Sequence, residues 1–520
     1  MPRATVAEKR LRKALDQDDD ALRELLREEY ASLDAEARAD LMHRLAKSAA
    51  GRTSGSPTLS ARLHGVREVL RERLPISVID ERQPIGLAVE QILGIDERSF
   101  WINGWARDLE GGGRIAVVSP EGCRVDLGDL AFRFERPDVV RFYAGLGPTD
   151  DRDHGFTAFF ELPAPSRLAT GWVVELHTAD GAAVEVLGPP VETDPQIARA
   201  SILGELDARG PLTGPLAVEH GRFALSRLQE RIVSEAEIDT VDVYGEPPEA
   251  PEVSIVVPLY RRLDFLEHQL LHFSVDPEVA EAELIFVLDS VEQSAELRDR
   301  ARELFALYGL PFRVVNPTAG SGYAGANRHG VEVATGSKLL LLNSDVIPDR
   351  PGWLGEMCRF YDAGDGIGAL GAKLLYEDDS LQHAGLYFHQ LPGTGSWENA
   401  HRFKGLHRSF PAAEVAQPVP AVTAACVLVD RERYEEVGGL PLHYVQGDYE
   451  DSELCLRLAA AGYENWYLPS AELYHLEGQS YVAEARRGLS DYNMWLHSQL
   501  WGETIAAVME RFDPHTAAGA

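Results

Sequence analysis

The stretch VSIVVPLY, residues 253–260, decides the fold of the C-terminal half of the chain. It is almost continuously apolar and rich in β-branched residues, and its proline cannot donate a hydrogen bond to a neighbouring strand. Such a run is typical of a strand buried on both faces of a parallel sheet. An amphipathic helix is expected directly after it, with an apolar face made of Leu263, Leu266, Leu270 and Phe273.

Strands and helices continue to alternate beyond this stretch. Apolar runs at 284–288, 312–315 and 338–342 predict three further strands, and 295–308 predicts a helix. Polar residues follow two of these runs, Asp289 after the first and Asn343 after the last. This order predicts an open α/β sheet, in which ligands bind at the carboxyl ends of the strands.

The composition excludes one class of partner. The chain has 520 residues and a formal net charge of −33, from 83 acidic and 50 basic residues. Binding to a nucleic-acid backbone needs concentrated positive charge, so no nucleic-acid partner is expected. The four cysteines are widely spaced and form no CxxC pair, which indicates free thiols in a reducing compartment. They are Cys123, Cys358, Cys426 and Cys455.

The sequence predicts no membrane anchor. No apolar run approaches the roughly 20 residues that span a bilayer, and MPRATVAEKR lacks the apolar core of a signal peptide. We therefore expect a soluble, cytoplasmic protein. Weak peripheral attachment to the inner face of the membrane and assembly into an oligomer both stay open.

The pattern of the chain changes several times and predicts five segments. Leucines at helical spacing come first, then short β-rich segments separated by Gly, Pro and Asp, then an acidic helical stretch that ends in DVYGEPPEAPEV. The segments are a helical segment (1–75), an antiparallel β-sandwich (76–192), a helical and acidic linker (193–250), the α/β domain (251–485), and a C-terminal helix and tail (486–520).

Four aromatic residues of the predicted sandwich have two interpretations. Exposed aromatic side chains on such a domain could bind carbohydrate, whereas buried ones would simply form its core. The residues are Trp101, Trp105, Phe156 and Phe160.

Three places in the α/β domain carry candidate chemistry. The triplet Asn343-Ser344-Asp345 follows a predicted strand, where a carboxylate can hold a divalent cation, although the triplet is also a good turn sequence. Glu450 and Asp451 open an amphipathic helix, where Asp451 is a candidate general base and helix capping is the competing explanation. His475 ends a short predicted strand and can return to the same cleft as a metal ligand.

A glycine-rich segment, GSGYAGANRHG at 320–330, opens another helix. Glycines there let the backbone approach a ligand closely. The segment is neither a Walker loop nor a spaced GxGxxG, so neither ATP nor NAD is indicated.

Seven motifs in order give a resemblance. From 253 to about 480 the chain resembles family-2 glycosyltransferases with the GT-A fold, a Rossmann-like nucleotide-diphospho-sugar transferase fold. The branch it is most similar to contains bacterial rhamnosyl- and galactofuranosyl-type transferases of surface polysaccharides. The motifs are VSIVVPLY, GANRHG, LLLLNSDV, KLLYEDDSLQHAG, AVTAACVLVDRERYEEVGG, YEDSELCLRLAAAGY and LPSAELYHLEGQS.

The resemblance implies a role for individual residues. Asp345 matches the last aspartate of the family's DxD motif and His475 its late histidine, which together bind Mn²⁺ or Mg²⁺. Asp451 matches the catalytic base, with Glu450 beside it. The residues implied to bind the nucleotide sugar are Pro258, Tyr260, Asp289, Asn327, Asn343, Ser344, Asp345, Gln382 and His383.

The sequence departs from the family pattern in several places. Asn343 replaces the first acid of DxD, so fewer protein carboxylates would hold the cation. The turn after the second strand is reduced to Leu288-Asp289-Ser290, which leaves the nucleobase open. The family's TGA appears as Thr423-Ala424-Ala425.

The resemblance implies an inverting, metal-dependent hexosyltransferase of surface polysaccharide synthesis. Its donor would be a UDP- or dTDP-linked sugar, and its acceptor a hydroxyl of a glycan or lipid-linked glycan. The alternative is a catalytically inactive glycosyltransferase-like protein that binds glycan as a scaffold. A nucleotidyltransferase ranks lower, because VVPLYRR lacks the GxGxRxxPxT/K-type signature of that class.

Overall fold

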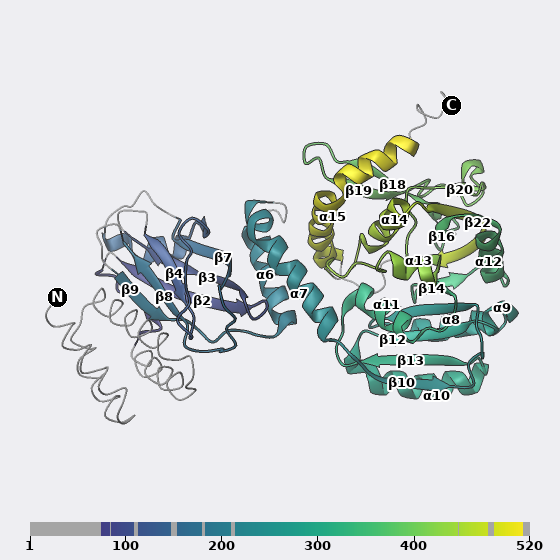
Figure 1. Ribbon diagram of the computed structural model, residues 1–520, viewed down its shortest axis with the longest axis horizontal. Coiled ribbons are helices and arrows are strands. Elements are labelled where there is room, and N and C mark those ends of the chain that lie inside the picture. Colours follow the sequence, from purple (N-terminus) through teal and green to yellow (C-terminus); the bar gives the residue numbers. More distant parts are fainter. Residues whose placement is uncertain are drawn as a thin grey trace, which may run out of the picture. The chain divides into compact units, whose positions relative to one another are not determined.

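The computed structural model describes residues 74–83, 85–108, 113–146, 153–178, 183–209, 214–445, 447–476 and 483–512 (Figure 1). The helices expected in 1–75 lie almost wholly outside these residues. The chain divides into two compact units, Met1–Leu228 and Gln229–Ala520.

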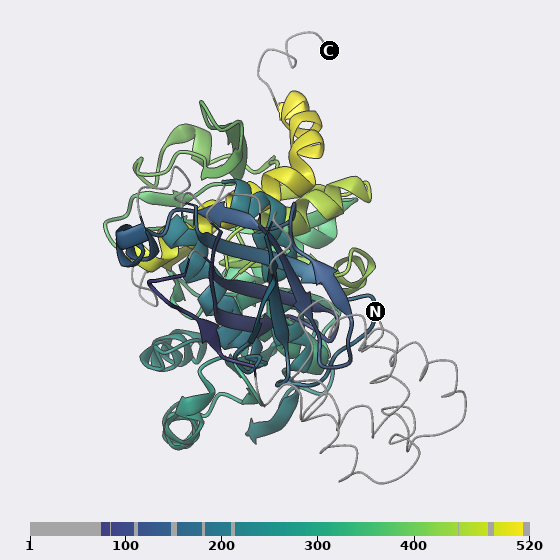
Figure 2. The ribbon, with the colours of Figure 1, turned by 90° about the vertical axis from the view of Figure 1, so that its left-hand side faces the viewer.

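The first unit contains two antiparallel sheets that share one apolar core. One has the strand order β1-β2-β3-β7-β6 and the other β5-β4-β8-β9. Side chains of both sheets meet in a single cluster of buried residues, among them Ile102 and Val174. The strands are β1 (Ser77–Val78), β2 (Gly86–Gly94), β3 (Ser99–Arg107), β4 (Arg114–Val118), β5 (Arg124–Asp126), β6 (Phe132–Phe134), β7 (Gly155–Glu161), β8 (Val173–His177) and β9 (Ala183–Leu187), shown from a second direction in Figure 2.

The four aromatic residues considered for carbohydrate binding are all buried in this unit: Trp101, Trp105, Phe156 and Phe160. Their burial favours the core interpretation, because a buried ring offers no face to a sugar. Helical segments accompany the two sheets, and the last of them crosses the boundary at Leu228. They are α5 (Pro137–Phe142), η2 (Ala144–Leu146), α6 (Pro195–Arg209), η3 (Ala217–Gly221) and α7 (Arg222–Glu235).

The second unit is built on a mixed sheet with the order β10-β13-β12-β11-β14-β21-β16-β22-β15. Its strands are β10 (Ile238–Tyr244), β11 (Val253–Leu259), β12 (Glu283–Leu288), β13 (Phe312–Pro317), β14 (Lys338–Leu342), β15 (Val346–Pro348), β16 (Ile367–Leu375), β21 (Cys426–Asp430) and β22 (Glu464–His475). β11 is parallel to both β12 and β14, whereas β21 is antiparallel to β14. The predicted α/β alternation is confirmed, and the antiparallel strands make the sheet mixed.

Helices cover both faces of this sheet (Figure 1). Alternate residues of β11 enter two separate apolar clusters, Ile255 and Val257 on one face and Val256 on the other. The first cluster also contains side chains of α8 (Asp264–Phe273), α10 (Ser294–Tyr308) and α12 (Trp353–Ala363). The second contains side chains of α11 (Gly322–Val333), α13 (Arg431–Glu436), α14 (Glu450–Ala460) and α15 (Ala483–Phe512).

The remaining elements of this unit are short. β17 (Leu381–His383) pairs with β16, β20 (Gln417–Pro418) pairs with β22, and β18 (Leu386–Gln390) pairs with β19 (Trp397–His401). Three others are single turns: α9 (Pro277–Ala280), η4 (Val291–Gln293) and η5 (Pro411–Ala413).

The structure differs from the sequence prediction at 238–244. These residues lie in the expected helical linker, yet they form strand β10, which pairs antiparallel with β13 at the edge of the sheet. Isoleucine, valine and tyrosine alternate there with polar residues, a pattern that suits a half-exposed edge strand.

The four cysteines are free, as predicted, and three of them are buried. No helix among the described residues is both long enough and apolar enough to span a membrane.

Candidate functional site

The candidate site lies where the parallel strands of the second unit end. Because β11, β12 and β14 run in the same direction, the residues after them meet at one edge of the sheet. Tyr260 follows β11, Asp289 follows β12 and the triplet 343–345 follows β14. Pro258, the penultimate residue of β11, lies opposite Val287 of β12.

Asp345 and His475 form a close pair at this edge. Strand β15 pairs with β22 so that Val346 lies opposite His475, which brings the histidine beside Asp345. Nε2 of His475 lies 3.4 Å from Oδ1 of Asp345, and both side chains are largely buried. The structure therefore brings together the two predicted metal ligands, which are 130 residues apart in the sequence.

The turn that carries Asp345 is fixed by backbone contacts. The side-chain amide of Gln269 donates to the carbonyl oxygens of Asn343 (2.9 Å) and Val346 (3.0 Å). The backbone N–H of Asn343 donates to the carbonyl oxygen of Ala425 at 2.9 Å. Ser344 is half-buried between the other two members of the triplet.

The donor set of this edge suits a hard divalent cation. Oδ1 of Asn343 and Nδ1 of His475 are buried without a hydrogen-bond partner, so both side chains keep polar atoms that their surroundings do not satisfy. Among the described residues no group of three or more His, Cys, Asp and Glu side chains converges. A cation here would need further oxygen ligands, which is how Mg²⁺ is ordinarily held between one or two carboxylates and substrate phosphates.

The acidic pair begins helix α14, as predicted. Asp451 is half-buried, and its carboxylate accepts hydrogen bonds from the backbone N–H groups of Ala424 (3.2 Å) and Ser452 (2.7 Å). Burial raises the pKa of Asp451 above its ordinary value, while these hydrogen bonds act in the opposite direction. A partly desolvated carboxylate with a raised pKa is a stronger base than an exposed one.

Glu450 is more deeply buried than Asp451. Burial raises the pKa of Glu450 well above its ordinary value, and the charges of Asp448 and Asp451 raise it further. Glu450 is therefore the member of the pair that more readily holds a proton, and Asp451 is the better candidate for a base.

Two adjacent residues, Ala424 and Ala425, connect the predicted base Asp451 to the edge of the sheet that carries Asp345 and His475. This edge is called the metal edge below. The N–H of Ala424 binds the Asp451 carboxylate, and the carbonyl oxygen of Ala425 binds the N–H of Asn343. Tyr323, on helix α11, donates to the carbonyl oxygen of Ala424 at 2.8 Å. The predicted base and the predicted metal-binding turn thus share one support.

Asp289 caps helix α11. Its Oδ1 accepts hydrogen bonds from the backbone N–H groups of Ser321 (2.7 Å) and Gly322 (3.0 Å). These N–H groups at the glycine-rich helix start are therefore already occupied by a carboxylate from the chain itself. Asn327 is buried one turn further on, where its amide donates to the carbonyl oxygen of Tyr323 at 2.9 Å.

Gln382 and His383 are buried on β17. Nδ1 of His383 lies 3.0 Å from Nδ1 of His401 on β19, and the two rings meet edge to face. Burial lowers the pKa of His383 well below its ordinary value, helped by the nearby charges of His401 and His475. His383 is thus a neutral residue between the metal edge and the β18–β19 hairpin.

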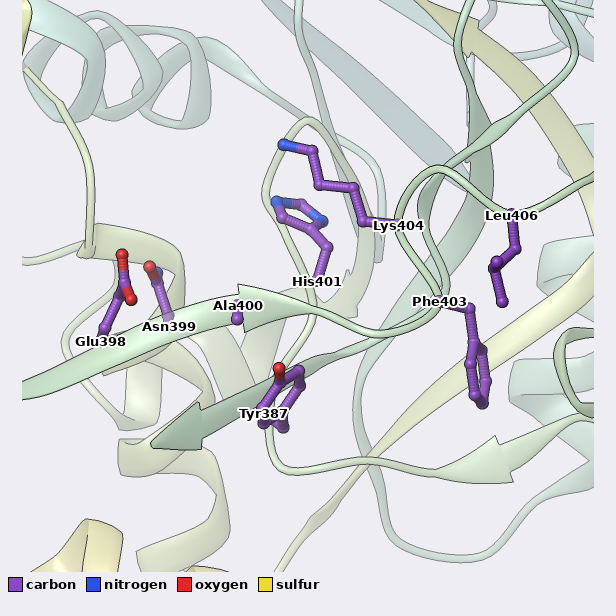
Figure 3. Close-up of a pocket in the computed structure, with 8 residues that line it drawn as sticks. All are labelled: Tyr387, Glu398, Asn399, Ala400, His401, Phe403, Lys404 and Leu406. Atoms are coloured by element: carbon purple, nitrogen blue, oxygen red, sulfur yellow. The ribbon is translucent and has the colours of Figure 1, made fainter. Parts of the chain in front are cut away.

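A cavity of about 620 Å³ opens at this hairpin (Figure 3). One lining residue, Asn399, donates from its side-chain amide to Oγ of Ser452 at 2.9 Å, next to the predicted base. The full lining is Tyr387, Glu398, Asn399, Ala400, His401, Phe403, Lys404 and Leu406. The sequence prediction missed these residues, although LYFHQ and WENAH around LPGTGS carry a hairpin signal that could have found them.

Comparisons with known proteins find one matching family and two curated relatives for this unit. Residues 250–491 match the model of the family described as "Glycosyltransferase like family 2". An uncharacterized protein y4gI of Sinorhizobium fredii (strain NBRC 101917 / NGR234) is 32% identical over 237 residues, which cover 44% of this chain and 25% of that protein. The O-antigen biosynthesis protein RfbC of Myxococcus xanthus is 29% identical over 255 residues, covering 47% of this chain and 19% of that protein.

The chain thus spans a quarter or less of the length of these two relatives. A solved structure of GalNAc-T7 with UDP, GalNAc and Mn²⁺ aligns with a TM-score of 0.36 and 15% identity, covering 44% of this chain and 45% of that one.

Proposed function

We propose that this chain, whose residues 250–491 belong to glycosyltransferase family 2, moves a sugar from a nucleoside-diphosphate sugar to a hydroxyl group of a glycan, with inversion at the anomeric carbon. The observation that carries the proposal is the shared support of the base and the metal-binding turn. Ala424 binds Asp451, and the adjacent Ala425 binds the turn that presents Asp345 to His475. An inverting transferase needs a base and a leaving-group site on the two sides of one sugar, which this arrangement can provide.

Asp451 would remove the proton from the attacking hydroxyl. The hydroxyl oxygen then bonds to the anomeric carbon as the bond from that carbon to the diphosphate oxygen breaks, and the proton stays on the Asp451 carboxylate. A single displacement of this kind inverts the anomeric centre and needs no covalent intermediate. The raised pKa of Asp451 suits it to accept the proton.

Asp345 and His475 would hold a Mn²⁺ or Mg²⁺ ion, with Asn343 as a further oxygen donor. When bound, such an ion stabilises the negative charge that develops on the departing diphosphate. Pro258, Tyr260 and Asp289 lie at the ends of the parallel strands, and Asn327 is buried on helix α11. We propose that these residues border the nucleotide. Ser344, Gln382 and His383 would complete the donor side.

One relative supports a proposal for the biological role. One of the two relatives is an O-antigen biosynthesis protein, which supports a role in polysaccharide synthesis. We extend this to a UDP- or dTDP-linked donor and a glycan or lipid-linked glycan acceptor at the cell envelope. An enzyme of this kind would work in the cytoplasm or at the inner face of the membrane.

A donor panel tests the proposal. UDP-, dTDP- and GDP-linked sugars are each incubated with the chain, Mn²⁺ and a mixture of glycan acceptors, and release of the nucleoside diphosphate is measured. We expect release from one donor class that stops when the cation is chelated. The anomeric configuration of the product, read from its proton NMR coupling, should be opposite to that of the donor. Absence of release from every donor, or retention of configuration, would contradict the proposal.

A further inference from the structure

The cavity at the β18–β19 hairpin has the composition of a saccharide site. Tyr387 lines the cavity and is 38% exposed, although it is a large aromatic residue. Glu398 and Asn399 add hydrogen-bonding groups from strand β19. An aromatic face next to polar groups suits a sugar, which has an apolar C–H face and a rim of hydroxyls.

The cavity borders the proposed base on one side. The Asn399 amide is bonded to Ser452, whose backbone N–H binds the Asp451 carboxylate. A ligand that contacts Asn399 would therefore be connected to Asp451 through Ser452. Asn399 is therefore the residue that links the cavity to the proposed base.

His401 connects the cavity to His383 on β17. His401 lines the cavity, and its Nδ1 faces Nδ1 of His383, whose charge environment includes His475. The backbone N–H of Gly385 donates to Nε2 of His383 at 3.3 Å, so Nε2 is an acceptor and the hydrogen of this neutral ring lies on Nδ1. His383 then donates to His401, which fixes the ring of His401 and places its own hydrogen on Nε2.

The hairpin is also held from behind. The backbone N–H of Trp397, at the start of β19, donates to Oγ of Ser498 on α15 at 2.7 Å. Helix α15 thus fixes the start of strand β19, which carries part of the cavity lining. Lys404 and Glu398 carry opposite charges within it, so the lining favours neither anions nor cations.

We propose that this cavity binds the acceptor of the transfer reaction, and that the acceptor is an uncharged saccharide stacked on Tyr387. This proposal rests on the proposed function, because the cavity can bind an acceptor only if the chain transfers a sugar. It adds a place and a chemical class for the second substrate, with Tyr387 as its main contact and Asn399 as the link to the base.

An array of immobilised neutral oligosaccharides, with a second set that carries uronate groups, provides the test. We expect the wild-type chain to bind at least one neutral member. Tyr387→Ala should weaken that binding about tenfold, the loss of one aromatic contact. Tyr387→Phe keeps the ring and should bind nearly as the wild type does. Leu307→Ala, at a residue that is 67% exposed on α10, is the matched surface control.

Calorimetric titration of UDP, dTDP and GDP with Mn²⁺ on the same variants separates the two proposals. We expect Tyr387→Ala to bind nucleotide as the wild type does. Absence of binding to every neutral oligosaccharide, equal binding by Tyr387→Ala, or a preference for the uronate set would overturn the cavity proposal alone. Tyr387-dependent saccharide binding without any nucleotide binding would overturn the acceptor role together with the proposed function, leaving a plain saccharide site.

Discussion

The side-chain amide nitrogen of Asn493 donates a 2.7 Å hydrogen bond to the carbonyl oxygen of Gly447, three residues before the acidic pair. The same side chain bonds both the N–H and the carbonyl oxygen of Val445, each at 3.0 Å. Asn493 is fully buried on α15, so the C-terminal helix holds the turn that leads into α14.

The turn at residues 447–449 has an unfavourable backbone conformation. Gly447, Asp448 and Tyr449 have φ values of 123°, 78° and 78°, in the left-handed region. A non-glycine residue there costs on the order of 1–3 kcal/mol and persists only where its surroundings enforce it. The three hydrogen bonds of Asn493 and the packing of the buried Tyr449 ring against His497 are contacts that enforce it.

Asn493→Asp should therefore lower turnover without weakening nucleotide binding. A carboxylate cannot donate the two bonds to Val445 and Gly447, so the turn relaxes and Asp451 shifts. A displacement of about 1 Å can cost up to about 10²-fold in rate. Steady-state kinetics and nucleotide titration check this, with Gln499→Ala, an exposed amide on the same helix, as control. Full activity in Asn493→Asp would remove Asn493 from a positioning role.

Asp451→Asn should reduce turnover by about 10²–10⁴-fold, the usual contribution of a general base. Nucleotide affinity should stay within about twofold of the wild-type value, because Asp451 is expected to contact the acceptor and not the diphosphate. Rates of nucleotide release with the active donor measure the effect. Asp299→Asn, an exposed residue on α10, makes the same chemical change far from the acidic pair in the sequence. Near wild-type turnover in Asp451→Asn would show that Asp451 is not the general base.

The raised pKa of Asp451 predicts an acid limb in the pH profile. The base works in its deprotonated form, so turnover falls as the pH drops through its pKa. Because burial raises this pKa above 3.8, the midpoint should lie at a higher pH than that of an exposed aspartate. A kcat/KM profile measures it. A midpoint at or below 3.8, or the same limb persisting in Asp451→Asn, would assign the titration to another group.

Glu453 makes a separate prediction about stability. It is buried and bonds Tyr444 (2.7 Å), His443 (3.1 Å) and Arg457. Although burial alone would raise the pKa of Glu453, these partners lower it from 4.5 to about 2. A lowered carboxyl pKa stabilises the folded state above pH 4.5, and this contribution is lost as the pH falls towards 2.

Glu453→Gln should thus lower the free energy of unfolding at pH 7 by up to roughly 3 kcal/mol. Denaturant titrations at a series of pH values measure the difference from the wild type, which should shrink between pH 4.5 and 2. Glu432→Gln, at an exposed residue of α13, is the matched control. A difference that does not change over this pH interval would show that the loss comes from packing and not from charge.

The central strands could be predicted from sequence because each is buried on both faces. β12, β14 and β16 are buried at every residue, so their sequences are continuous apolar runs whose ends are easy to place. β10 was mistaken for linker because it is an edge strand with several exposed residues and is followed by GEPPEAPEV. Only its pairing with β13, about 70 residues later, makes it a strand.

Motif order was enough to select Asp345, Asp451 and His475 as candidates, whereas the contacts around them could not be read from the sequence. Asn399 meets Ser452 across 53 residues, and His383 meets His401 across a hairpin. Such contacts depend on how two elements pack, and no local pattern records them. Asn493 was missed for the same reason, since it belongs to a helix that looks like a plain C-terminal segment.

Calorimetric titration of UDP, dTDP and GDP, each with and without Mn²⁺, tests the central claim most directly. The account predicts that one nucleotide binds only with Mn²⁺, and that Asp345→Ala abolishes this binding while Asp299→Asn leaves it intact. Binding that is independent of the cation, or that survives in Asp345→Ala, would contradict the metal site. Binding of none of the three nucleotides would contradict the transferase itself and favour an inactive glycan-binding scaffold.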